Sequence, residues 1–242
     1  MIYLISDVHG RYEEFVRLLR KVRFRKTDQL YVLGDVIDRG ENNLKMLDFC
    51  RLEENVTLLK GNHELFMQRY LEGSPWLREH WKSWGGNTTL RELERTPEEK
   101  KEEYLQYLQG LPHWKCLRVN ETDYFLTHSG FSVEIAEPVM REDGKINIEE
   151  SVRLFVKLDE WAYLVSDDLH FLPASITFDR YIICGHYPTL EYRAEGGVYR
   201  TPKFTDIDCG CAWKQPSPHR RMACLCLDTG EVVYQKLRTV RV

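Results

Sequence analysis

The 242-residue chain is predicted to be an α/β protein with a largely parallel central sheet. Short apolar runs alternate with segments of helical periodicity from the N-terminus onward, which is the rhythm of βαβ units. Several of these runs end in a small polar cluster that contains glycine. Ligands of open α/β sheets bind outside the carboxyl ends of the strands, so these clusters are candidate site residues.

The first part of the chain contains three predicted strands and two predicted helices. Strands are expected at residues 2–6, 30–33 and 56–59, because each is a short apolar run that ends at polar or glycine residues. Helices are expected at about 12–22 and 43–52, since their apolar residues recur three or four positions apart.

Residues 64–111 differ in character, being charged and helical, with a cluster of three tryptophans, Trp76, Trp81 and Trp84. We interpret this segment as a helical insertion within a single domain, residues 1–242. The tryptophans form either part of the core or a wall that faces a substrate. Aromatic residues at helical spacing are more often core.

The second half of the chain returns to strands. These are predicted at 113–119, 124–127 and 180–184, with an amphipathic helix at 149–164. Residues 197–237 alternate in polarity and are punctuated by turn residues, which predicts a β-meander.

Composition excludes several classes of protein. The hydrophobic fraction of 43%, the charged fraction of 30% and the net charge of −4 are typical of a globular protein, and they argue against binding to a nucleic-acid polymer or a membrane. The N-terminal apolar run ends at Ser6 and Asp7, which makes it too short for a signal peptide. We therefore expect a cytoplasmic protein.

The seven cysteines form no framework of spaced pairs and are expected to be reduced thiols. Cys209 and Cys211, like Cys224 and Cys226, are two positions apart, which places each pair on one face of a strand. Zinc binding or a disulfide is the alternative to a role as small buried hydrophobes, and the second interpretation is favoured.

Five of the predicted strands end in polar motifs: SDVHG at 6–10, GDVIDRG at 34–40, GNHE at 61–64, HSG at 128–130 and GH at 185–186. We expect them to converge on one site at the carboxyl ends of the strands. The candidate donors are oxygen and imidazole groups without a thiolate, a set that suits Mn, Fe or Zn. They are Asp7, His9, Asp35, Asn62, His128 and His186. Six donors suit two divalent ions that share a bridging carboxylate.

These motifs, in this order, resemble the metallophosphoesterase (calcineurin-like) superfamily, and within it the phosphoprotein-phosphatase branch, over about residues 2–236. Residues 84–90 (WGGNTTL) and 206–210 (DIDCG) resemble segments of the bacterial and phage serine/threonine protein phosphatases. The resemblance implies central β-sheets flanked by helices, a four-layer αββα sandwich.

The resemblance also implies roles for single residues. Asp7 and His9 would hold the first ion, Asn62, His128 and His186 the second, and Asp35 would bridge the pair. His63 would be the general acid, oriented by Asp38, and Arg39 would bind phosphate oxygens. The nucleophile would be a metal-bridging hydroxide.

The chain departs from the family pattern at Ser129, where members usually have alanine or glycine, and at two places that concern phosphate binding. Lys60 stands where members often have the arginine of RGNHE, and the stretch 161–168 lacks the arginine that the branch usually carries. Lys60 is therefore expected to contact phosphate as a point charge, with a weaker clamp than an arginine provides.

The expected function is hydrolysis of phosphomonoesters by two metal ions, Mn²⁺ above all, with phosphoserine or phosphothreonine in proteins as the substrate. One alternative is a symmetrical dinucleoside-tetraphosphate hydrolase, whose motifs tend to be GDxxARG and GNHD where this chain has Asp38 and Glu64. A phosphodiesterase acting on small nucleotides and a catalytically silent binding scaffold are the others. The partner is thus a phosphoprotein or a small phosphorylated molecule.

Overall fold

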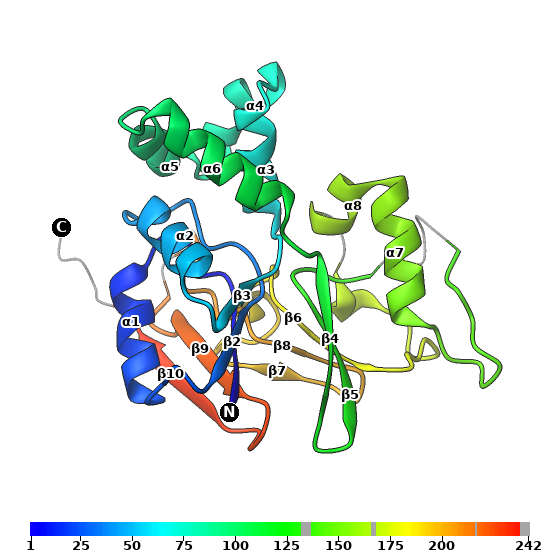
Figure 1. Ribbon diagram of the computed structural model, residues 1–242. Helices are drawn as coiled ribbons and strands as arrows, with labels where there is room; N and C mark the ends of the chain where they lie inside the picture. The colour runs from blue at the N-terminus through cyan, green and yellow to red at the C-terminus, as the bar shows by residue number, and fades with distance from the viewer. Residues whose placement is uncertain (132–136, 166–167, 216, 238–242) are drawn as a thin grey trace.

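The computed structural model describes residues 1–131, 137–165, 168–215 and 217–237. Its named strands form two five-stranded mixed sheets (Figure 1). The first sheet has the order β10-β9-β1-β2-β3, with β1 Ile2–Ile5, β2 Gln29–Val32, β3 Val56–Leu58, β9 Arg221–Cys226 and β10 Val232–Lys236. The second has the order β4-β5-β6-β8-β7, with β4 Trp114–Val119, β5 Thr122–Thr127, β6 Tyr181–Cys184, β7 Tyr199–Arg200 and β8 Phe204–Asp206.

The order of the helical and sheet layers follows from which apolar clusters the adjacent residues of a strand belong to. In β1, Tyr3 and Ile5 belong to the apolar cluster that includes residues of helix α1 (Tyr12–Lys21), whereas Leu4 belongs to the cluster between the two sheets. In β6, Ile183 lies in that same inter-sheet cluster, whereas Ile182 packs with residues of helix α7 (Ile148–Leu158). Since successive strand residues point to opposite faces, the order is helix, sheet, sheet, helix. The predicted αββα sandwich is confirmed.

Helices cover the two outer faces. Figure 1 shows α1 Tyr12–Lys21 and α2 Asn43–Leu52 on one side of the sheets, and α7 Ile148–Leu158 and α8 Glu160–Val165 on the other. Short 3₁₀ helices, η2 Leu169–Phe171 and η3 Thr189–Glu191, occur later in the chain. None of the helices in the described ranges is long and apolar enough to cross a membrane.

The segment between β3 and β4 is helical, as predicted. Its elements are α3 Asn62–Leu71, α4 Pro75–His80, η1 Trp81–Trp84, α5 Asn87–Leu93 and α6 Glu98–Gln109. Figure 1 shows them gathered together beyond one end of the sheets. Trp81 is fully buried and belongs to the same apolar cluster as α1 and β1, so this segment shares the main core.

The prediction of one continuous helix at 149–164 was wrong. The chain breaks at Asp159, whose φ of −155° and ψ of 91° are extended. The Asp159 carboxylate accepts a hydrogen bond from Ala162 N at 2.9 Å, which caps the start of α8. Hydrophobic periodicity continues through this break, so the pattern alone does not reveal it.

The predicted meander at 197–237 was also wrong in its connectivity. β7 and β8 belong to the second sheet, where β8 lies parallel to β6, whereas β9 and β10 form a hairpin in the first sheet. Residues 207–211, between the two pairs, are buried. The chain thus passes from one sheet to the other at this point, which alternation in polarity cannot show.

All seven cysteines are free thiols. Cys224 and Cys226 lie on β9 and share one apolar cluster, as their spacing predicted. Cys209 and Cys211 instead follow β8 in a loop, so the strand interpretation was wrong for that pair. The thiol of Cys211 donates to Asp7 O at 2.8 Å.

Glu160 anchors the start of α8. Its carboxylate accepts hydrogen bonds from His113 at 2.8 Å, from Arg69 at 3.1 Å and from the buried Lys60 at 3.2 Å. The hydrogen bond from His113 and the charge of Lys60 lower the pKa of Glu160 to about 2, although burial opposes them. The carboxylate is therefore more stable ionised in the folded protein than in the unfolded chain.

Replacing this carboxylate tests the anchor. A folded-state pKa below the unfolded value contributes stability above about pH 4.5, and that stability is lost as the pH falls towards 2. We expect Glu160→Gln to lower the free energy of unfolding by about 1–2 kcal/mol at pH 7, since solvent partly screens the ion pairs of Glu160. Urea denaturation should show the deficit shrinking between about pH 5 and 2, while Glu54→Gln, at an exposed position, should show none. A deficit independent of pH would contradict the assignment.

Candidate active site

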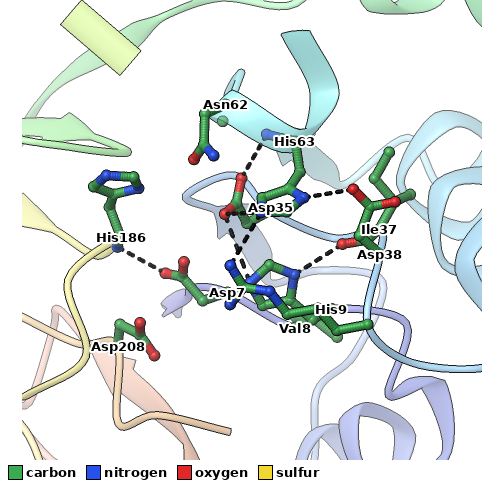
Figure 2. A network of polar contacts seen from close by, with 12 residues as sticks. Asp7, Val8, His9, Asp35, Ile37, Asp38, Asn62, His63, His186 and Asp208 are labelled. Atoms are coloured by element: carbon green, nitrogen blue, oxygen red, sulfur yellow. Dashed lines mark hydrogen bonds and ion pairs between the residues drawn. The ribbon is translucent and has the colours of Figure 1, made fainter. Parts of the chain in front are cut away.

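Loops that follow parallel strands bring the predicted donors together. β1, β2 and β3 are mutually parallel in the first sheet, and β5 and β6 are parallel in the second. Their carboxyl ends lead into the five motifs. Figure 2 shows side chains from the segments that follow β1, β2, β3 and β6 gathered around Asp35.

Three of the histidines are held in one orientation by backbone carbonyl oxygens. The contacts are His9 Nδ1 to Ile37 O at 2.8 Å, His128 Nδ1 to Leu33 O at 2.7 Å and His186 Nε2 to Val165 O at 3.2 Å. A ring nitrogen that faces a carbonyl oxygen must carry the proton. The opposite nitrogen of each neutral ring therefore presents its lone pair, as in a metal-binding histidine.

The lone pairs around His128 meet at short range. His128 Nε2 lies 2.9 Å from Asn62 Oδ1, 3.1 Å from His186 Nδ1 and 3.4 Å from Asp35 Oδ1. The protons of His128 and His186 lie on the ring nitrogens that face backbone carbonyls, so His128 Nε2 and His186 Nδ1 are both acceptors. Acceptor atoms this close together repel one another, and a bound cation would stabilise them. Imidazole and carboxylate or amide oxygen form a donor set that fits a borderline divalent ion.

A second group of donors shares the same carboxylate. Atoms of His9, Asp35 and His63 lie within 4.8 Å of one another, and so do atoms of Asp35, His128 and His186. Asp35 Oδ2 is 3.6 Å from His9 Nε2 and 3.8 Å from His63 Nε2. Because Asp35 belongs to both groups, it could bridge two ions. The residues present thus fit a two-metal centre.

Asp7 lies in the same cluster, but its visible contacts are to protein groups. Its Oδ2 accepts a hydrogen bond from His186 N at 3.0 Å and contacts the hydroxyl of Ser6. Burial raises the pKa of Asp7 to about 6. Its role as a metal ligand stays a prediction.

Burial and neighbouring groups shift the pKa values of the side chains around Asp35 in opposite directions. Burial alone would raise the pKa of Asp35, yet the surrounding imidazoles hold it well below its usual range. Burial lowers the pKa of His128, but the charges of Asp35 and Asp7 outweigh it and raise the value. Burial and the neighbouring His128 lower the pKa of His186 to about 3. Asp35 is thus held as a carboxylate, and His186 as a neutral imidazole at neutral pH.

His63 and Asp38 form the predicted pair. His63 Nδ1 is 2.5 Å from Asp38 Oδ2, and both side chains are buried. The carboxylate also accepts a hydrogen bond from Trp81 Nε1 at 2.6 Å and one from the hydroxyl of Thr89. With Nδ1 donating to Asp38, the Nε2 atom of His63 is the one that faces the site.

Trp81 and Thr89 were missed as supports of this pair. The resemblance of residues 84–90 to a phosphatase segment already drew attention to Thr89, whereas nothing in the sequence singled out Trp81 beyond its place among three tryptophans. Both orient a carboxylate that lies 43 or more positions away in sequence.

Arg39 is exposed and lies beside His63. Its Nη2 is 3.2 Å from His63 Nε2, and its backbone N donates to Gly85 O at 3.0 Å. A side chain at Gly85 would place its Cβ 2.6 Å from Arg39 Cγ, so this close approach requires glycine. The guanidinium is therefore positioned at the mouth of the site, where it could bind phosphate oxygens.

Lys60 is buried and already has two side-chain partners. Its ammonium group donates to Gln68 at 2.9 Å and to Glu160 at 3.2 Å, and the residue is 3% exposed. A contact with phosphate would require Lys60 to leave both partners. In the stretch 161–168, residues 166 and 167 lie outside the described part of the chain.

Glu64 is a functional side chain that the sequence analysis did not assign. Its buried carboxylate accepts hydrogen bonds from Asp35 N at 2.7 Å, Val36 N at 2.9 Å and Gly61 N at 2.9 Å. Burial and the charge of Asp35 raise the pKa of Glu64 to about 7, against the opposing effect of the backbone donors. One carboxylate thereby ties the loop after β2 to the loop after β3.

Backbone strain is concentrated in the same loops. Most of the described non-glycine residues with positive φ belong to the predicted site. They are Asp7, His9, Asp35, Asp38, Arg39 and His186, with φ between 46° and 75°. Such conformations cost free energy and persist where surrounding contacts enforce them, as at functional sites.

The sequence matches the family of calcineurin-like phosphoesterases over residues 1–207. The chain belongs to this family. Its members use divalent metal ions to hydrolyse phosphate esters, in agreement with the two donor groups around Asp35.

Several relatives are symmetrical bis(5'-nucleosyl)-tetraphosphatases. The protein of Nitrosomonas europaea is 23% identical over 263 aligned residues, covering 88% of this chain and 91% of that protein. The protein of Neisseria meningitidis is 28% identical over 165 residues, or 64% of this chain and 54% of that protein. The protein of Nitrosospira multiformis is 32% identical over 142 residues, which cover 56% of this chain and 47% of that protein. The alignment thus spans about half the length of the last two proteins.

Solved structures show the same fold at low sequence identity. A metallophosphoesterase from Sphaerobacter thermophilus superimposes with a TM-score of 0.52 at 16% identity, covering 99% of this chain and 88% of that one. A cold-active protein-tyrosine phosphatase from Shewanella gives a TM-score of 0.55 at 16% identity, with 97% and 80% coverage.

The buried carboxylate of Glu64 is the contact to test here. We expect Glu64→Gln to lower the free energy of unfolding by about 2–3 kcal/mol and to weaken Mn²⁺ binding, because an amide N–H₂ would oppose backbone donors. Denaturation and calorimetric Mn²⁺ titration measure the two effects.

Glu92→Gln is the matched control. Glu92 likewise accepts three hydrogen bonds, from Asn43 N, Asn43 Nδ2 and Leu44 N, but at the start of α2. The Glu92→Gln variant should be less stable than the wild-type chain but bind Mn²⁺ with the same affinity. Equal Mn²⁺ affinities in the two variants would show that Glu64 only stabilises the fold.

Proposed function

We propose that this chain is a two-metal symmetrical dinucleoside-tetraphosphate hydrolase, which cleaves its substrate into two nucleoside diphosphates. The observation that carries the two-metal chemistry is the carboxylate of Asp35, shared by two groups of imidazole donors. The named activity of the Neisseria, Nitrosomonas and Nitrosospira relatives supports the choice of substrate.

The proposed ligands are those that cluster around Asp35. His9 and Asp7 would hold one ion, His128, His186 and Asn62 the other, and Asp35 both. When bound, two Mn²⁺ ions, or Fe or Zn in their place, would activate a water molecule and stabilise charge on the phosphate oxygens.

The remaining polar side chains act on the substrate. Arg39, at the mouth of the site, would bind non-bridging phosphate oxygens through its planar guanidinium. His63, its Nδ1 held by Asp38, would direct Nε2 at the leaving oxygen and donate a proton there.

Phosphomonoesters such as phosphoserine or phosphothreonine are the second candidate substrates, and one observation favours them. The buried Asp38–His63 pair at 2.5 Å is suited to a general acid. A serine alkoxide is a poor leaving group that needs this proton, whereas a nucleoside diphosphate leaves as a stabilised phosphate anion. The symmetrical hydrolases tend to have alanine at the position of Asp38.

The two candidates respond differently to loss of the general acid. With Mn²⁺ present, we expect the wild-type chain to turn over diadenosine tetraphosphate faster than a phosphoserine peptide. His63→Ala should slow the peptide reaction by about 10²–10⁴-fold and the tetraphosphate reaction much less. Asp35→Asn should abolish both, as the control for metal-dependent chemistry.

Steady-state kinetics on both substrates decides between them. Turnover of the peptide alone would reject the dinucleoside tetraphosphate and leave a phosphomonoesterase. Undiminished turnover in Asp35→Asn would reject the two-metal centre itself.

A further inference from the structure

We propose that Trp76, Trp84 and Trp161 form a stacking surface that holds a nucleobase of the substrate beside the candidate active site. This inference rests on the proposed function, since it assigns a position to the base of the dinucleotide. We call these three residues the tryptophan surface.

The tryptophan surface is continuous with the general-acid side of the site. The ring of Phe66 lies 5.3 Å from that of His63, 4.8 Å from Trp84 and 5.1 Å from Trp161. Phe66 itself is 3% exposed, so it supports the surface from below. A single buried aromatic side chain therefore separates the tryptophan surface from His63.

Trp76 is the outermost member. Its ring is 5.2 Å from Trp84 and 5.5 Å from Trp161 and stacks on the ring of His80 at 4.6 Å, yet the residue is still 48% exposed. Trp84 and Trp161 are half-buried. Leaving large indole area in water is unfavourable, and exposed apolar patches of this kind are typical of ligand sites.

The three indoles come from three different helices. Trp76 and Trp84 come from α4 and η1, whereas Trp161 comes from α8, nearly eighty positions further along the chain. The third tryptophan of the helical segment, Trp81, is fully buried and hydrogen-bonded to Asp38. Core packing and support of Asp38 thus account for Trp81, but they do not account for the exposed area of Trp76.

The charge next to the surface identifies the class of ligand. Gly85, which directly follows Trp84, accepts the hydrogen bond of Arg39 N at 3.0 Å. Arg39 thus lies next to the residue that follows Trp84, and we place the phosphate chain of the ligand towards its guanidinium and the base towards the indoles. A nucleotide offers both complements, an anionic phosphate chain and a flat aromatic base. Stacking on indole is tolerant of base identity, so adenine and guanine should both bind.

Binding of product-like ligands tests the tryptophan surface without catalysis. ADP and inorganic pyrophosphate share a diphosphate, but only ADP has a base. By calorimetric titration of the Mn²⁺-loaded chain, we expect ADP to bind more tightly than pyrophosphate. Trp76→Ala should weaken ADP binding roughly tenfold and leave pyrophosphate unchanged. Trp76→Phe should restore part of the affinity.

Phe171→Ala is the matched control, because Phe171 is an aromatic residue with 79% exposure outside this cluster. It should change neither affinity. Equal wild-type affinities for ADP and pyrophosphate would overturn the proposal, even if diadenosine tetraphosphate is hydrolysed. A Trp76→Ala loss seen with a phosphotyrosine peptide but not with ADP would also overturn it. Base-dependent ADP binding without tetraphosphate turnover would instead support the surface and reject the proposed reaction.

Discussion

The site depends on one buried carboxylate that is not itself a proposed ligand. Glu64 accepts hydrogen bonds from the backbones of Asp35, Val36 and Gly61, and so joins the ends of two parallel strands. These donors lie in the loops that follow the strands, where a side chain takes the place of a strand partner. Because Glu64 fixes the backbone of Asp35, the Asp35 carboxylate stays between the two groups of histidines.

The same principle of external support recurs around the rest of the site. Backbone carbonyls fix the rings of His9, His128 and His186, and Trp81 and Thr89 fix Asp38. Positive φ angles in these loops are strained, and the strain is sustained by contacts from other elements. The site is preorganised because its supports come from the sandwich and from the helical segment together.

Local patterns predicted the strand ends and the donors, but not what holds them. The apolar runs located β1, β2, β3, β5 and β6 because burial and strand periodicity are local properties. Trp81 and Thr89 support Asp38 from 43 and 51 positions away. Two of the three donors to Glu64 lie 28 and 29 positions away, and no local pattern encodes such contacts. Lys60 is a case of the same kind, since its partner Glu160 lies 100 positions further along. The break at Asp159 and the change of sheet after β8 are likewise tertiary features.

Anomalous diffraction from crystals of the Mn²⁺-loaded chain tests the central claim most directly, namely that Asp35 is shared by two metal sites. The account predicts two manganese peaks about 3.5–4 Å apart, on either side of the Asp35 carboxylate, one near His9 and the other near His128 and His186. A single peak, or two peaks without a shared contact to Asp35, would contradict it.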